Sequence, residues 1–100
     1  MYYKDALGEV IREERLAQGK TMRFLADNSP IALGYLSEVE RGHKEASSIV
    51  LERIADGLGK EPYELVIEAG MKMYRDRLPE VVYLPDRAGW YDQYSDLIRT

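Results

Sequence analysis

Apolar residues recur at helical spacing along the first 70 positions of this 100-residue chain. In one such run Leu51, Ile54, Ala55 and Leu58 fall on a single helical face. Serine or threonine before these runs, and glycine after them, are the usual first and last residues of helices. The pattern predicts five helices, at about residues 5–18, 21–28, 32–41, 48–58 and 62–69. We therefore expect an all-α domain, in which Gly70 either ends the fifth helix or only weakens it.

The pattern changes in character from Tyr74 onward. Two prolines, Pro79 and Pro85, bracket an extended-looking EVVYL, and half of the ten aromatic residues lie in these last 27 positions. Apolar residues at near-helical spacing follow, at Trp90, Tyr91, Tyr94, Leu97 and Ile98. We therefore expect one domain over residues 1–70 and an aromatic-rich C-terminal extension over residues 71–100, which serves dimerisation or packing.

Composition narrows the class of protein. Hydrophobic residues make up 45% of the chain and charged residues 32%, which is typical of a folded globular protein. The absence of cysteine excludes disulfides, zinc–thiolate sites and thiol catalysis. No apolar run approaches the roughly 18 residues of a membrane span, and MYYKDALGEV lacks the apolar stretch of a signal peptide. These features predict a cytoplasmic protein.

The net charge of −4 is unevenly distributed. Residues 1–60 carry 9 basic and 10 acidic side chains, a net of −1, and residues 61–100 carry 5 and 8, a net of −3. Between Lys20 and Lys44 the balance reverses to +1, with 4 basic and 3 acidic side chains. The bulk charge argues weakly against a nucleic-acid-binding protein, but only the charge that faces the phosphates matters for such binding.

The second and third predicted helices are short and are separated by the turn Asn28-Ser29-Pro30-Ile31. This is the layout of a helix-turn-helix, in which the second helix enters the major groove of DNA. Many helical bundles contain such a pair, so the layout alone does not identify a DNA-binding motif, and the residues themselves must be compared. The stretch TMRFLADNSPIALGYLSEVERG, residues 21–42, resembles the Cro/lambda-repressor-like (XRE) family. The matching features are Thr21, Leu25-Ala26, Ile31, Tyr35-Leu36-Ser37 and Val39-Glu40-Arg41-Gly42.

The resemblance covers roughly residues 6–68, and LGYLSEVERGHKEASS is similar to the ClgR group of regulators, which activate genes for Clp proteases and chaperones. It implies a five-helix lambda-repressor-like domain and a transcriptional regulator that binds a near-palindromic operator as a homodimer. Residues 32–41 would be the recognition helix. The implied partner is double-stranded DNA, with RNA polymerase or another regulatory protein as a further candidate. No cofactor, metal or membrane is implied, and the protein would be cytoplasmic and nucleoid-associated.

The family's base-reading positions fall on Leu33, Gly34, Ser37 and Glu38. Leu33 can press against a thymine methyl group, and Glu38 can accept a hydrogen bond from cytosine N4. Gly34 permits close approach of the backbone, and the Ser37 hydroxyl can donate or accept. Two alternatives stay open: Leu33 packs in the core, or Glu38 is a solvated charge that only repels phosphate.

Phosphate contacts are expected on both sides of this helix, since helix N-termini and cationic side chains hold phosphates in register without reading sequence. The candidates are Thr21, Met22, Arg23, Tyr35, Arg41, His43, Lys44 and Ser48. Three positions depart from the family pattern: Met22 replaces a common glutamine, Pro30 a common glycine, and Ala32 the usual polar cap. His43 is the only histidine, so a metal site is not expected.

The resemblance also gives Glu40 a structural role. In proteins of this family the glutamate of the E-R-G segment turns inward and pairs with an arginine of the first helix, which corresponds here to Arg15. The alternative is that Glu40 is exposed to solvent and pairs with nothing.

A dimer would give useful specificity, because one module of this size reads too few base pairs. The fifth helix and the C-terminal residues are the best candidates for its surface: Tyr63, Val66, Tyr74, Trp90, Tyr91, Tyr94 and Leu97. The alternative is that the C-terminal segment folds back on its own domain.

Two other functional classes fit the sequence less well. An enzyme is disfavoured, because carboxylates such as Glu13 and Glu14 follow the pattern of a solvated helix face, and the chain has no histidine-based triad or glycine-rich phosphate loop. An antitoxin-like or antirepressor-like module that grips a protein is the stronger competitor, because Met22, Glu38, the low net charge and the aromatic C-terminal segment suit it.

Overall fold

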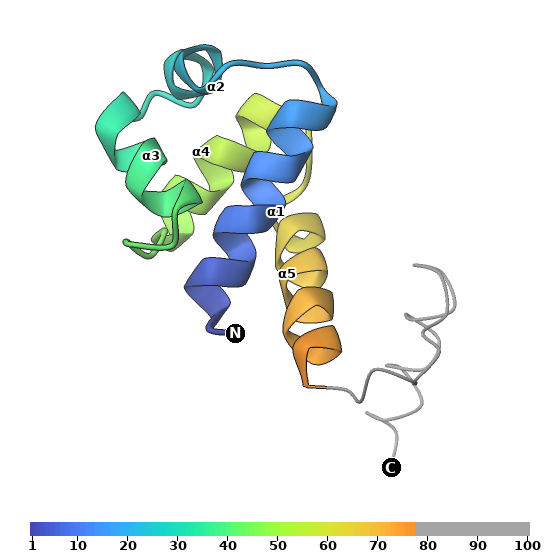
Figure 1. Cartoon of the computed structure of the whole chain (residues 1–100). Helices are drawn as coiled ribbons and strands as arrows, with labels where there is room; N and C mark the ends of the chain where they lie inside the picture. The colour runs from blue at the N-terminus through green and yellow to red at the C-terminus, as the bar shows by residue number, and fades with distance from the viewer. Residues whose placement is uncertain (78–100) are drawn as a thin grey trace.

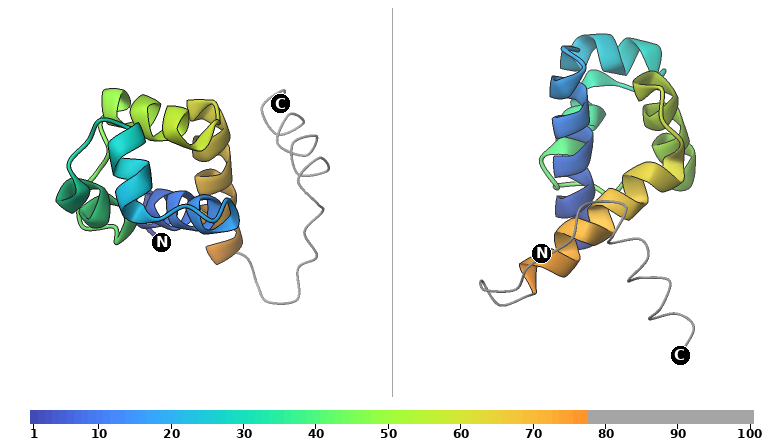
Figure 2. Two further views of the ribbon diagram at one scale, coloured as in Figure 1. Left: turned by 90° about the horizontal axis from the view of Figure 1, so that it is seen from above. Right: turned by 90° about the vertical axis from the view of Figure 1, so that its right-hand side faces the viewer.

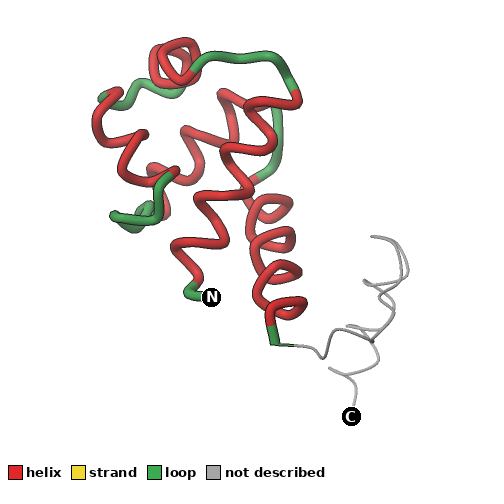
Figure 3. Tube along the Cα trace, in the orientation of Figure 1, coloured by secondary structure: helices red, strands yellow, loops and turns green. Residues whose placement is uncertain are grey.

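The computed structural model describes residues 1–77, which form five helices and no strand (Figure 1, Figure 3). The helices are α1 (Tyr3–Ala17), α2 (Met22–Asn28), α3 (Leu33–Glu40), α4 (Ser48–Leu58) and α5 (Pro62–Asp76). The predicted five-helix all-α fold is confirmed. Trp90, Tyr91, Tyr94 and Leu97 lie outside the described residues. None of the helices within residues 1–77 is long and apolar enough to cross a lipid bilayer.

The helix ends follow local chemistry. The Thr21 side chain caps α2 by accepting a hydrogen bond from the Phe24 N–H at 3.0 Å. The Ser47 hydroxyl does the same for α4, accepting from the Val50 N–H, so Ser47 is the cap of that helix. The helix α1 begins at Tyr3, earlier than expected. The helix α5 continues through Gly70 to Asp76, which is the second of the two outcomes expected for that glycine. Residue 70 therefore lies inside a helix, because one glycine weakens a helix without ending it.

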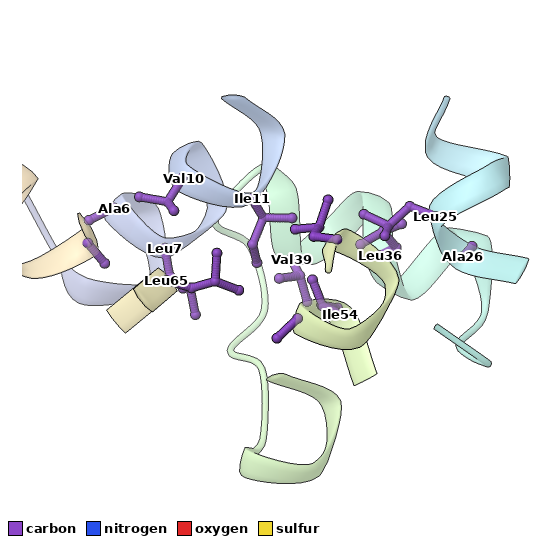
Figure 4. Close-up of a cluster of buried hydrophobic side chains, with 13 residues drawn as sticks. Ala6, Leu7, Val10, Ile11, Leu25, Ala26, Leu36, Val39, Ile54 and Leu65 are labelled. Carbon is purple, nitrogen blue, oxygen red and sulfur yellow. The ribbon is translucent and has the colours of Figure 1, made fainter. Parts of the chain in front are cut away.

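The core receives a large apolar side chain from every helix. Ile11, Leu25, Leu36, Ile54 and Leu65 are all at most 1% exposed (Figure 4). The helices α2 and α3 lie at one end of the molecule and α5 at the other, with α1 and α4 between them (Figure 1, Figure 2). Burial of the inner side of α3 therefore fixes which of its side chains face outward.

One glycine sets the distance between α1 and α3. A Cβ atom on Gly8 would lie 2.5 Å from the backbone oxygen of Val39 and 2.7 Å from that of Glu40. Such distances leave no room for a methyl group. Gly8 therefore allows the last turn of α3 to pack directly on the backbone of α1, which brings the acidic end of α3 close to α1.

Ion pairs tie α5 to α1. The Lys72 ammonium lies 2.9 Å from a Glu13 oxygen and 3.5 Å from a Glu9 oxygen. Its hydrogen bond to Glu13 is the main reason why the pKa of Lys72 is raised. At the C-terminal end of α5, the Met1 ammonium lies 2.7 Å from Asp76 and lowers the pKa of that carboxyl. These exposed pairs order the surface of α5 and contribute little to stability individually.

Candidate nucleic-acid interface

The helix α3 has one buried side and one outward side. Leu36 and Val39 are at most 1% exposed and belong to the core. Leu33 and Gly34 are exposed, while Ser37 and Glu38 are partly exposed. All four residues predicted to read bases are therefore outside the core, and the alternative that Leu33 packs inside is wrong, since Leu33 is 36% exposed.

The turn before α3 is held without a side-chain cap. Ala32 is the N-cap residue and has an extended backbone, and no side chain accepts a hydrogen bond from the first amides of the helix. Pro30 has φ of 24°, on the positive side that favours glycine and that a pyrrolidine ring resists. The Ile31 N–H donates to the Ala26 oxygen at 3.2 Å and anchors the turn on α2. The uncapped amides of α3 thus remain available to an acceptor from outside.

Arg15 and Glu40 form a buried bidentate pair. The Arg15 Nε–H donates to Glu40 Oε2 at 2.8 Å, and Arg15 Nη2 donates to Oε1 at 3.0 Å. The two side chains are only 9% and 2% exposed. The remaining guanidinium nitrogen, Nη1, donates to the backbone oxygen of Lys20 at 2.9 Å. The pair implied by the family resemblance is therefore present, and it joins α1, α3 and the start of the loop to α2.

The end of α3 turns back on itself at a glycine. The N–H of Gly42 donates to the Val39 oxygen and that of His43 to the Glu38 oxygen, which is the hydrogen-bonding of a Schellman motif. Gly42 supplies the required φ, at 76°, and it packs so closely on Asp5 of α1 that a side chain has no room there. The reversal places His43 over the last turn of α3.

Glu38 is held on both of its carboxylate oxygens. Oε1 accepts from Arg41 Nη2 at 2.6 Å, and Oε2 lies 3.4 Å from His43 Nδ1. All three side chains remain open to solvent, with 32% of Glu38, 56% of Arg41 and 61% of His43 exposed. Glu38 is thus a partly solvated charge, as one alternative expected, but it is also paired, and its carboxylate sits between two residues that were predicted to contact phosphate.

Other predicted phosphate contacts lie at the starts of α2 and α4, on α3 and in the loop after it. Arg23 and Ser48 are exposed near the starts of α2 and α4. The Tyr35 hydroxyl donates to the Glu45 backbone oxygen at 2.7 Å, and the Lys44 ammonium lies 6.0 Å from the centre of the Tyr35 ring. The ring therefore orders both the loop after α3 and its lysine.

Met22 differs from the other candidates. Its side chain is partly buried, packs against the core and carries no hydrogen-bond donor. A phosphate can gain nothing from this thioether. Only the backbone N–H of Met22, in the first turn of α2, remains as a possible donor.

An open hollow of about 680 Å³ lies between α1 and the end of α3. It is lined by Asp5, Glu9, Arg12, Arg15, Met22, Ser37, Glu40, Arg41 and His43. Arg12 is exposed and was missed by the sequence reasoning, although it precedes Arg15 by one helical turn on the same side of α1. It brings a cation of α1 to the hollow that Arg41 and His43 border.

A second surface feature lies on α5. Tyr63, Val66 and Tyr74 are 61%, 40% and 41% exposed, while Leu65 and Ala69 on the other side of the helix are buried. A Cβ atom added to Gly70 would meet nothing within 4 Å, so this outer side is open as well. Within residues 1–77 the helix α5 thus presents an apolar side that no other helix covers.

Two short packed helices, the second with a buried inner side and an outer side of small, apolar and polar groups bordered by cations, define a helix-turn-helix protein. The family model of this class, Helix-turn-helix, matches residues 11–65, and the chain belongs to that family, in its XRE type. One relative is the transcriptional regulator ClgR of Mycobacterium tuberculosis, which is 42% identical over 72 residues. The match covers 72% of this chain and 64% of that protein, so the chain spans less than two thirds of the length of its curated relative.

Solved structures agree with this assignment. The clp gene regulator ClgR from C. glutamicum superposes with a TM-score of 0.69 and 41% identity, over 73% of this chain and 95% of that one. A second structure of that regulator from Corynebacterium glutamicum gives 0.73 at 33% identity, over 99% and 89%. The restriction-modification controller protein C.AhdI from Aeromonas hydrophila gives 0.61 at 34% identity, over 62% and 94%.

Proposed function

We propose that this protein is a sequence-specific DNA-binding transcriptional regulator of the ClgR type, which reads the major groove with α3. The observation that supports this most directly is the orientation of α3. Its inner residues are locked in the core, while Leu33, Gly34 and Ser37 are turned outward beside Arg41, His43 and Lys44. A rigid helix that presents small and apolar groups between cations fits base readout flanked by phosphate contacts.

In this proposal the outward residues divide into two groups. Leu33 contacts a thymine methyl group, the Gly34 backbone approaches the groove closely, and the Ser37 hydroxyl bonds a base edge. Phosphates are held by the side chains of Thr21, Arg23, Tyr35, Arg41, His43, Lys44 and Ser48, by the Met22 amide, and by Arg12. Glu40 takes no part in either group, since its carboxylate is buried and paired with Arg15.

The outer side of α5 is proposed to bind a second copy of the chain. Tyr63, Val66 and Tyr74 offer apolar surface, and Gly70 between them lets a second helix approach. A two-fold dimer would set its two recognition helices about 34 Å apart, one turn of DNA, and so read a near-palindromic operator. Light scattering on the full chain tests this: Val66→Glu should lower the mass to that of a monomer, whereas Leu16→Glu, at another exposed apolar position, should not.

The target genes are proposed by analogy with the relatives. The matching C. glutamicum protein is described as a clp gene regulator, so genes for proteolysis and stress are the first candidates. Regulation of transcription would then involve RNA polymerase or another regulatory protein as a partner. The cell compartment that fits this role is the cytoplasm, at the nucleoid.

The deciding experiment is selection of duplexes from a random library by the full chain, followed by titration at several salt concentrations. We expect a near-palindromic consensus and an affinity that falls steeply as salt rises. Enrichment of no sequence would contradict the regulator and favour the antitoxin-like or antirepressor-like module. Ser37→Ala serves as the reader variant, which should alter preference at one base position, and Lys60→Ala, on the loop between α4 and α5, as its neutral control.

A further inference from the structure

The cluster Glu38, Arg41 and His43 lies where the proposed regulator meets DNA, and it contains one anion for two potential cations. The three side chains come from the last turn of α3 and the first residues after it. Their arrangement follows from the Schellman motif around Gly42, which brings the chain after the helix back against its last turn. His43 thereby lies beside Glu38, and Arg41 reaches the same carboxylate from one helical turn away.

A carboxylate in this place costs DNA affinity if it acts alone. DNA presents a line of phosphates, and an exposed acid facing them is repelled. The carboxylate of Glu38 resembles a phosphate in one respect, since it offers two anionic oxygens to a guanidinium. Arg41 is therefore already paired with an anion of the protein before any phosphate arrives, and His43 lies beside the same carboxylate. The guanidinium is held in place but part of its charge is neutralised, and the imidazole adds a positive charge to the cluster only when it is protonated.

We propose that Glu38 is an internal stand-in for a DNA phosphate, which positions Arg41 and His43 in the free protein and competes with phosphate for them. This inference rests on the proposed DNA-binding function. A weak, sequence-independent encounter must displace the carboxylate and gains little. Every duplex, operator or not, requires this exchange, so Glu38 lowers affinity by a similar factor whatever the sequence. Its effect passes through Arg41 and His43 and not through a base.

This role differs measurably from that of a base reader. A reader that accepts from cytosine N4 affects affinity only at operators with cytosine at one position. The stand-in affects binding to every duplex alike. It also changes the salt dependence, because neutralised cations displace fewer counterions from DNA.

The test compares Glu38→Gln with Glu13→Gln on a duplex of unrelated sequence at several salt concentrations. The two substitutions remove the same charge, and Glu13 also accepts from a basic side chain, Lys72 at 2.9 Å, but on the α1–α5 side. Glu38→Gln should bind about 3- to 10-fold tighter than wild type at low salt, the size of two exposed charge interactions. The slope of log K against log salt should steepen by about 0.9, as for one more neutralised phosphate. Glu13→Gln should match wild type within about twofold.

A double-mutant cycle shows whether Glu38 acts through its two partners. In the background Arg41→Gln/His43→Gln, we expect the substitution of Glu38 to change affinity by less than about twofold. The proposal is overturned if Glu38→Gln behaves like Glu13→Gln, if its gain persists without Arg41 and His43, or if its effect is confined to duplexes with one particular cytosine.

A second polyanion separates failure of this proposal from failure of the regulator. On a heparin column, Glu38→Gln should elute at higher salt than Glu13→Gln. If library selection finds no preferred duplex but this order on heparin holds, the regulator assignment fails and the stand-in survives. If selection succeeds but the two variants co-elute and bind duplexes alike, the stand-in fails and the regulator assignment survives.

Discussion

Removing one partner of the Arg15–Glu40 pair should be among the most damaging polar changes in this chain. Glu40→Gln keeps the size of the side chain but leaves the Arg15 guanidinium buried without a counter-charge. Both side chains are less than a tenth exposed, and the pair is bidentate at 2.8 and 3.0 Å. Leaving a buried charge unpaired costs about 3–5 kcal/mol. For a domain of this size, each kcal/mol lowers Tm by roughly 4–8 °C, so we expect a loss of roughly 12–40 °C.

Urea unfolding followed by circular dichroism measures this loss. The free energy of unfolding should fall by about 3–5 kcal/mol with an unchanged m-value, since the same surface is exposed on unfolding. Glu13→Gln is the matched control, because its bond to Lys72 is exposed and worth about 0.2–1 kcal/mol. A loss for Glu40→Gln no larger than that of the control would refute the buried pair.

Replacing both partners distinguishes the pair's contribution to stability from the cost of a stranded charge. Arg15→Met/Glu40→Leu removes both charges and fills the space with apolar atoms. Buried pairs replaced in this way often leave stability unchanged or raise it by about 1–4 kcal/mol. The double variant should therefore recover most of the loss caused by Glu40→Gln. If it is as unstable as the single variant, the packing of Arg15 and its bond to the Lys20 oxygen matter more than its charge.

Four further changes test other features. Gly8→Ala places a methyl group within 2.7 Å of two carbonyl oxygens and should cost about 1–3 kcal/mol. Gly34→Ala meets no atom and should stabilise α3 by about 0.5–1 kcal/mol while weakening DNA binding. Thermal unfolding measures the stability of both variants, and a DNA titration measures the binding of Gly34→Ala. If Gly8→Ala were as stable as wild type, the close packing at Gly8 would be contradicted. Pro30→Gly should raise Tm, because relief of about 1–3 kcal/mol of backbone strain exceeds the roughly 0.4–1 kcal/mol of added unfolded-state entropy; a lower Tm in calorimetry would contradict the strain. Lys44→Ala should weaken binding to all duplexes alike and reduce the salt slope by about 0.9, whereas a loss at one base position only would contradict a phosphate contact.

The sequence predicts the helices well because their determinants are local. Caps such as Thr21, and apolar stripes such as that of α4, depend on residues within a few positions of each other. The end of α5 was harder to predict. A glycine at position 70 destabilises the helix by a small free energy, and the packing of α5 on α1 easily exceeds it. The distant pair of Arg15 and Glu40 came from the family resemblance, since nothing local to either residue indicates that it is buried.

The contacts of Glu38 show where sequence reasoning stopped short. The signal was present, because a glycine after a helix predicts a Schellman motif, and that motif brings His43 to Glu38. The prediction that Glu38 reads a base came from register alone and did not consider these neighbours. Arg12 was missed for a different reason: only the packing of α1 against the end of α3 shows that it borders the same hollow as Arg41. Local geometry was thus predictable in principle, and the tertiary juxtaposition was not.

The net charge of −4 is compatible with a cationic DNA-facing surface because of where the acids are engaged. Glu40 is buried against Arg15, and Glu38 lies between Arg41 and His43, so neither acid on α3 is without a basic neighbour. Glu9 and Glu13 both contact Lys72 of α5, although Glu9 also lines the hollow beside Arg41 and His43. The net charge counts these four glutamates equally, although salt screens an exposed charge from a phosphate more than roughly 10 Å away. The charge that decides DNA binding is therefore that of a few side chains around α3. Among them, Glu38 is the one whose neutralisation should raise the affinity for every duplex.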